Sequence, residues 1–233
     1  GRLPAVPADA TTRAEVPGIP GVRYVLPDEM PELLKDAQDS LVAELRARAD
    51  GGVTGPLPPV NFLAVSGGGD DGAYGAGMLN GWTAAGTRPE FKLVTGISTG
   101  ALIAPFAFLG PKYDGVLREF YTSVTPKDIL EERNKLAALF KDGLADNAPL
   151  KQLVRKVITE EMVKEIASEH AKGRLLLVAT TNFDARRPVI WNMTKIAASA
   201  SPNRLDLFQA ILVASAAIPG AFPPTMIDVE VDG

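Results

Sequence analysis

A serine between two glycines is the first group in this sequence that could do covalent chemistry. Gly96, Ser98 and Gly100 match the pattern G-x-S-x-G, in which the serine lies on a sharp turn between a strand and a helix with its hydroxyl exposed. Residues 91–95 have the pattern of a strand, and residues 99–109 that of an apolar helix. The N-terminus of that helix would favour negative charge beside the serine. The pattern therefore predicts Ser98 as a nucleophile; the alternative is a turn in which the serine only caps the helix.

A glycine-rich loop comes earlier in the chain, after a short apolar segment and before a predicted helix. Residues 66–72 are SGGGDDG. Consecutive glycines can direct several backbone N–H groups into one small space, where they would hold the negative oxygen of a tetrahedral intermediate. We therefore assign Gly67, Gly68 and Gly69 to a candidate oxyanion hole. A tight turn capped by an aspartate is one alternative. A dinucleotide-binding loop is another, but the acidic residue that it needs at the end of the next strand is replaced by Ser98.

Together these segments resemble the patatin-like phospholipases. The resemblance covers the chain from about Asn61 to its end. It rests on the blocks VSGGGDDGAYGAG (residues 65–77), TGISTGAL (95–102) and ASAAIPGAFPP (214–224), and on Asp232-Gly233, which is similar to the start of a D-G-G or D-G-A box. The resemblance implies a three-layer α/β/α domain with a mostly parallel central sheet. It also implies cleavage of acyl esters of phospholipids or other lipids through an acyl-enzyme, without a histidine.

The same resemblance implies roles for individual residues. Ser98 would be the nucleophile, Asp232 its base and Gly67 to Gly69 the oxyanion loop, with no metal or cofactor. One position departs from the family pattern, since Asp71 stands where a lysine or arginine is usual. The departure puts in doubt any role of that cation in binding an anionic head group. We expect Asp71 to point outward at the helix N-terminus, where negative charge is favourable.

The single histidine of the chain bears on the choice between a dyad and a triad. His170 ends a charged helical segment, a position where a histidine complements the helix dipole. No histidine follows Asp232, although a triad in an α/β-hydrolase places it last. The residues therefore favour a Ser–Asp dyad. Two other interpretations stay open: an α/β-hydrolase-type esterase with its histidine outside this sequence, and a non-catalytic lipid-binding protein.

Composition narrows the remaining classes of function. The 233 residues include 46% hydrophobic and 22% charged residues, with a net charge of -4, as in globular proteins with a substantial core. The absence of a basic cluster argues against nucleic acid as a partner. The absence of cysteine excludes disulfides, thiolate zinc sites and a cysteine nucleophile. We expect a lipid or acyl ester as substrate, and leave a peripheral membrane surface open as a further partner.

Two parts of the chain differ in organisation. Residues 1–59 read as a proline-rich arm followed by one helix (residues 32–49), and residues 60–233 as the catalytic domain, which we expect to be incomplete at its C-terminus. In the second part strands and helices alternate, which predicts an α/β fold. Strands are expected at 61–65, 91–95, 174–180, 189–192 and 226–231, and helices at 72–85, 99–109, 113–124, 149–170 and 205–217. The arm favours an exported, envelope-associated protein, with the cytoplasm as the alternative.

Overall fold

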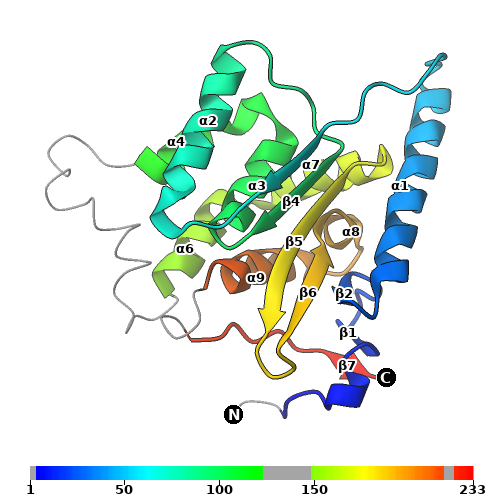
Figure 1. Ribbon diagram of the computed structural model, residues 1–233, viewed down its shortest axis with the longest axis vertical. Coiled ribbons are helices and arrows are strands. Elements are labelled where there is room, and N and C mark those ends of the chain that lie inside the picture. Colours follow the sequence, from blue (N-terminus) through cyan, green and yellow to red (C-terminus); the bar gives the residue numbers. More distant parts are fainter. Residues whose placement is uncertain (1–3, 123–147, 218–222, 233) are drawn as a thin grey trace, which may run out of the picture.

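A five-stranded mixed sheet forms the centre of the computed structural model, which describes residues 4–122, 148–217 and 223–232 (Figure 1). Its order is β2-β6-β5-β4-β3. The strands are β2 (Arg23–Val25), β3 (Phe62–Val65), β4 (Leu93–Ile97), β5 (Leu175–Asn182) and β6 (Arg187–Asn192). The pairs β3–β4 and β4–β5 are parallel, whereas β5–β6 and β6–β2 are antiparallel. The predicted α/β fold is confirmed, and its parallel part is the part that carries Ser98.

Helices flank this sheet, and two of them, α3 and α9, pack against β4 or β5 and against each other. The helices are α1 (Met30–Asp50), α2 (Gly72–Ala84), α3 (Thr99–Leu109), α4 (Asp114–Thr122), α6 (Ala148–Val157), α7 (Glu160–Ala171), α8 (Met193–Ala198) and α9 (Arg204–Ala216). Short 3-10 turns lie at Ala8–Ala10, Gly69–Asp71 and Pro111–Tyr113. No helix in these described parts is long and apolar enough to span a bilayer.

The apolar helix after the serine belongs to the core. Ten of the 11 residues of α3 are buried, which explains why its sequence shows no polar face. Phe106 and Phe108 are each only 1% exposed. Their aromatic rings therefore contribute to core packing rather than to an acyl pocket.

One predicted helix is divided into two. The sequence predicts a single helix over residues 149–170, but the structure has α6 ending at Val157 and α7 starting at Glu160. Thr159 caps the second helix, because its hydroxyl accepts the backbone N–H of Met162 at 3.3 Å. A threonine in this extended conformation stabilises a new helix start instead of continuing the old one.

The N-terminal part of the chain completes the sheet. β2 is an edge strand whose residues are all buried, so this stretch of the proline-rich arm is part of the packed fold. Upstream, β1 (Ala14–Glu15) pairs with β7 (Glu230–Val231) in a separate two-stranded sheet. The last predicted strand, residues 226–231, is therefore shorter than expected and lies outside the central sheet. The domain boundary at residue 60 stays a prediction, although the two parts share one sheet.

Helix α1 is attached to the domain through polar side chains. Asp36, Ser40 and Glu44 follow one another at four-residue spacing and so share one face. Their partners are Tyr24 and Asn192, then the Gly173 carbonyl, then Lys92. The helix lies near the β2 edge (Figure 1), and its leucines at positions 34, 41 and 45 are exposed.

Candidate active site

Ser98 lies in a strained turn between β4 and α3. Its backbone has φ 55° and ψ -130°, and it is one of three described non-glycine residues with positive φ. Such a conformation is costly for a residue with a side chain and tends to occur where a side chain must be presented for function. The geometry agrees with the strand–turn–helix setting of a nucleophilic serine.

The two glycines around Ser98 are required by close packing. A Cβ on Gly100 would lie 2.1 Å from the Val65 carbonyl oxygen, and one on Gly96 would lie 2.6 Å from the Gly100 oxygen. Helix α3 therefore starts so near to β3 and β4 that no larger residue fits at these two positions. This contact fixes where the serine turn sits on the sheet.

The glycine-rich loop lies directly against the serine. A Cβ on Gly67 would come within 2.8 Å of Ser98 Cβ and 3.3 Å of Ser98 Oγ. The hydroxyl of Thr99, the residue after the serine, donates to the Gly69 carbonyl at 2.8 Å. Gly69 itself has φ 57°, which a residue with a side chain adopts only at a cost. The structure thus brings together Ser98 and the loop that the sequence indicated as an oxyanion hole.

Asp71 lies where the sequence placed it, at the N-terminus of α2. It is the N-cap residue, is exposed, and makes no side-chain capping bond. A Cβ on Gly68 would lie 3.3 Å from its Cβ and 4.0 Å from its carboxylate. The carboxylate therefore adjoins the outer part of the loop, at a helix end that tolerates negative charge.

A second serine supports the turn and was missed as a functional residue by sequence reasoning. The Ser98 backbone N–H donates to Ser215 Oγ at 2.9 Å, and Ser215 Oγ donates in turn to the Ala179 carbonyl at 2.7 Å. One hydroxyl on α9 thus links the serine turn to β5. Ser215 lies inside the block of residues 214–224 that resembles the family. The block marked this segment as important, but the contact of Ser215 with Ser98 could be recognised only from the fold.

Asp232 is not brought to Ser98 in this structure. Its side chain is 67% exposed and its carboxylate lies 3.4 Å from Arg13 Nε. It follows β7, which pairs with β1 and not with the central sheet. Within the described ranges, no carboxylate forms a hydrogen bond with the hydroxyl of Ser98.

Comparison with known proteins bears directly on this arrangement. A family model described as patatin-like phospholipase matches residues 63–233. The chain belongs to the patatin-like phospholipase family. It is therefore a member of a family of lipid acyl hydrolases, with lipids as the class of substrate. No curated protein matches the chain.

The single histidine of this patatin-like phospholipase lies away from the serine turn. His170 is in the last turn of α7, and shares a shallow hollow with Lys195, Ser199 and residues 18–20. Burial lowers the pKa of its imidazole, an effect that Asp36 opposes and Lys195 reinforces. Its Nδ1 is buried and has no hydrogen-bond partner among the described residues. These surroundings are those of a packed structural histidine.

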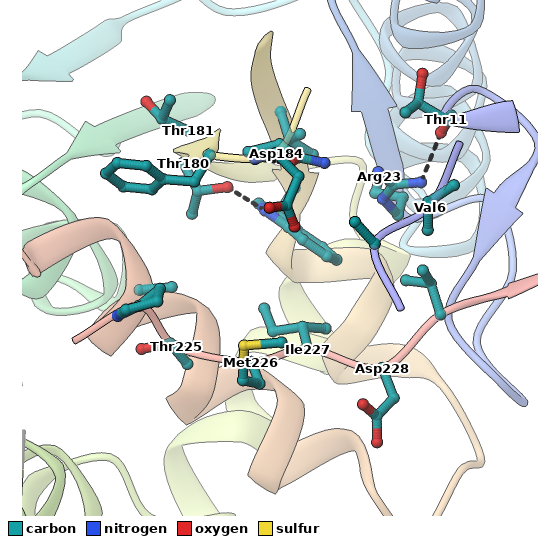
Figure 2. Close-up of a pocket in the computed structure, with 18 of the residues that line it drawn as sticks. Val6, Thr11, Arg23, Thr180, Thr181, Asp184, Thr225, Met226, Ile227 and Asp228 are labelled. Carbon is teal, nitrogen blue, oxygen red and sulfur yellow. Dashed lines mark hydrogen bonds between the residues drawn. The ribbon is translucent and has the colours of Figure 1, made fainter. Parts of the chain in front are cut away.

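A cavity of about 430 Å³ in this patatin-like phospholipase lies between the C-terminal end of β5 and residues 224–229 (Figure 2). Thr180, Ala214 and Ala217 line it, next to the Ala179 and Ser215 that support Ser98. Ser98 itself is not in the lining, whereas Asp184 and Asp228 are. The described residues contain no cluster of three or more histidine or acidic side chains suited to a metal ion.

Proposed function

We propose that this chain cleaves lipid carboxylic esters, with Ser98 as nucleophile and Asp232 as general base. The observation that carries the proposal is the strained Ser98 turn, with Gly67 packed against the serine and α3 starting behind it. Family membership supports a lipid substrate. Strain of this kind is consistent with a side chain held ready for chemistry.

The reaction would proceed in two steps. In the first, Ser98 Oγ bonds to the ester carbonyl carbon while Asp232 takes its proton, and the tetrahedral intermediate then releases the alcohol together with that proton. In the second, water attacks the acyl carbon while Asp232 takes a proton from it. The bond to Ser98 Oγ then breaks, Asp232 returns the proton to Oγ, and the fatty acid leaves. Backbone N–H groups of Gly67, Gly68 and Gly69 would stabilise the oxyanion of both intermediates. The N-terminus of α3 would add to that stabilisation.

The proposal requires the carboxylate of Asp232 to leave Arg13 and to contact the hydroxyl of Ser98 instead. An exposed ion pair such as Arg13–Asp232 contributes only about 0–1 kcal/mol, so its loss is a small cost. Residues 223–229, which precede β7, form no helix or strand. Few backbone bonds therefore oppose a shift of this segment, and the pairing of β7 with β1 is only two residues long.

Labelling with a fluorophosphonate probe tests the nucleophile directly. The probe should modify Ser98 in the intact protein, and Ser98→Ala should abolish both labelling and ester hydrolysis without loss of the folded state. p-Nitrophenyl esters from acetate to palmitate should show turnover that depends on chain length. A folded protein that takes no label and hydrolyses none of the esters would instead be a non-catalytic lipid-binding protein.

A further inference from the structure

Helix α1 is attached to the domain through polar side chains, which leaves its leucines at the surface. Asp36 and Ser40 are buried and make hydrogen bonds into the domain. Leu34, Leu41 and Leu45 are 57%, 44% and 49% exposed, and their spacings of seven and four residues place them on one face of the helix. A helix of a globular domain ordinarily buries its apolar face and exposes its polar one. The reversed arrangement of α1 indicates that a second apolar surface covers these leucines.

The linker after α1 continues the apolar face of the helix. Arg48 follows Leu41 and Leu45 by seven and three residues, so it lies on the same side of α1. Its Nη2 donates to the Pro56 carbonyl at 3.0 Å, and its own carbonyl accepts the Val53 N–H at 2.8 Å. These bonds hold the start of the linker, which runs from the end of α1 towards β3 (Figure 1), on the leucine side. The exposed apolar residues of the linker are Val53, Leu57 and Val60.

Charge is absent from the whole stretch that joins α1 to the glycine-rich loop. No residue from position 51 to position 69 is charged, and three of the linker residues are prolines. Proline has no backbone N–H, so fewer unpaired donors would meet an apolar medium here. β3 then begins with Phe62, whose side chain is 68% exposed. A strand of four residues spans about 13 Å, so Phe62 lies about that far along the strand from the loop assigned to the oxyanion hole.

The chemistry of this surface indicates what covers it. Its apolar side chains are spread over a helix, an irregular linker and the start of a strand. A stable protein interface requires shape complementarity and a polar rim, whereas a lipid surface accepts any exposed apolar side chains that lack charge. The family acts on lipids, which are gathered in bilayers or droplets in water. The polar side of α1 carries both signs of charge, as in the Lys35–Asp39 ion pair at 2.7 Å, and so favours no charged partner.

We propose that the α1–linker surface, formed by the exposed side chains of Leu34, Leu41, Leu45, Val53, Leu57 and Val60, docks on a lipid surface. The polar face of α1 stays attached to the domain, so the helix lies along the membrane interface with its leucines among the acyl chains. Docking holds the glycine-rich loop near the lipids that supply the substrate. The inference rests on the proposed function only in that the substrate is a lipid, because adsorption requires no catalysis.

Sedimentation with vesicles tests the docking with protein that cannot hydrolyse the lipid. The full chain carrying Ser98→Ala is mixed with sucrose-loaded vesicles of dioleoylphosphatidylcholine at low and at high salt, and the bound fraction is measured. We expect binding to these neutral vesicles that persists at high salt, because salt screens charges and not apolar contacts. No binding would overturn the proposal, as would binding that needs an anionic lipid and disappears at high salt.

Matched substitutions locate the surface. Leu34→Gln and Phe183→Gln each remove an apolar side chain that is 57% exposed, but Phe183 lies in the turn between β5 and β6. Leu34→Gln should lower the vesicle partition coefficient about threefold to tenfold, and Leu41→Gln with Leu45→Gln about tenfold to hundredfold. Phe183→Gln should leave it unchanged. Because all four side chains are exposed, circular dichroism should show each variant folded. Equal partition of the double leucine variant and the parent would overturn the proposal.

The remaining outcomes separate docking from catalysis and from self-association. With Ser98 intact, the double leucine variant should lose about tenfold more activity on vesicle phospholipid than on soluble p-nitrophenyl butyrate. If neither ester is cleaved while the parent still binds vesicles through the leucines, the proposed reaction is wrong and the docking surface stands. If the leucine substitutions convert a dimer into a monomer in analytical ultracentrifugation and leave vesicle binding unchanged, the surface is an interface between copies and the docking proposal is wrong.

Discussion

The backbone N–H of Ser98 donates to the hydroxyl of Ser215, which lies 117 residues later in the chain, at a distance of 2.9 Å. Because the Ser215 hydroxyl also bonds to the Ala179 carbonyl at 2.7 Å, it fixes the serine turn between α9 and β5. We infer that Ser215 positions the nucleophile without touching the substrate.

Ser215→Ala should therefore lower kcat by about tenfold while KM stays nearly constant. Removing the hydroxyl leaves the Ser98 N–H and the Ala179 carbonyl without this partner, which should lower the free energy of unfolding by about 1–3 kcal/mol. The strained turn would then relax in part. Steady-state kinetics and thermal unfolding would measure both effects. Ser215→Thr keeps the hydroxyl and should restore most of the turnover; equal loss in both variants would indicate a packing effect instead.

Gly67→Ala should disrupt catalysis by displacing the nucleophile. The added methyl would lie 2.8 Å from Ser98 Cβ, and a shift of about 1 Å at a reacting group can cost on the order of 10²-fold in rate. Gly77→Ala is the matched control, since its Cβ would meet nothing within 4 Å on helix α2. The control should keep full activity and gain about 0.5–1 kcal/mol of stability. Full activity of Gly67→Ala would show that the loop can move aside.

Gly69→Ala tests the oxyanion loop itself. Its φ of 57° should cost stability when a side chain is added, by about 1–2 kcal/mol, and a misplaced N–H donor should lower turnover about 10²–10³-fold. Gly86→Ala separates the two effects, because Gly86 has φ 71° and equally open surroundings but lies at the end of α2. Both variants should lose similar stability in denaturant unfolding, and only Gly69→Ala should lose turnover.

The assignment of Asp232 predicts opposite effects for the two members of its ion pair. Asp232→Asn should lower turnover by about 10²–10⁴-fold, as expected for loss of a general base. Arg13→Gln should leave turnover unchanged or raise it a few-fold, because it releases Asp232 from the contact at 3.4 Å. Glu230→Gln, on the short strand β7 just before Asp232, is the control and should be active. A strong loss in Asp184→Asn or Asp228→Asn, with Asp232→Asn active, would reassign the base.

His170 should affect the pH dependence of stability and leave catalysis unchanged. Its pKa is lowered by burial, so below a pH of about 6.5 the unfolded chain binds more protons than the folded one. The free energy of unfolding should therefore fall as the pH drops from 7 to 5, and His170→Gln should reduce that fall. Turnover of His170→Gln at pH 7 should equal that of the parent. A large loss of kcat would restore a triad as the better hypothesis.

Local patterns predicted the part of the fold that carries Ser98. The β3–loop–α2 and β4–turn–α3 units follow from short-range signals, namely apolar runs and glycines at turns, so both could be read from the sequence. β2 was missed because three residues between prolines give too little periodicity for a strand. The break before α7 depends on the cap formed by Thr159, which the apolar pattern alone does not reveal.

The long-range parts of the site could not be predicted in this way. Ser215 acts through a bond to a residue 117 positions away, and nothing in its neighbours distinguishes it from a serine that merely faces the core. Asp232 follows a strand, as the sequence predicted, but that strand pairs with β1 instead of joining the central sheet.

The bond from Thr99 to the Gly69 carbonyl, at 2.8 Å, has a consequence for redesign. It joins residues 66–72 to residues 95–100, and the contact of Gly100 with Val65 leaves no space to shift one segment past the other. A glycine-rich loop transplanted from another hydrolase would lose these contacts unless the serine turn of that hydrolase was transplanted with it. The two segments should be exchanged as one cassette, and chimeras that swap either alone should fold yet lose most of their activity.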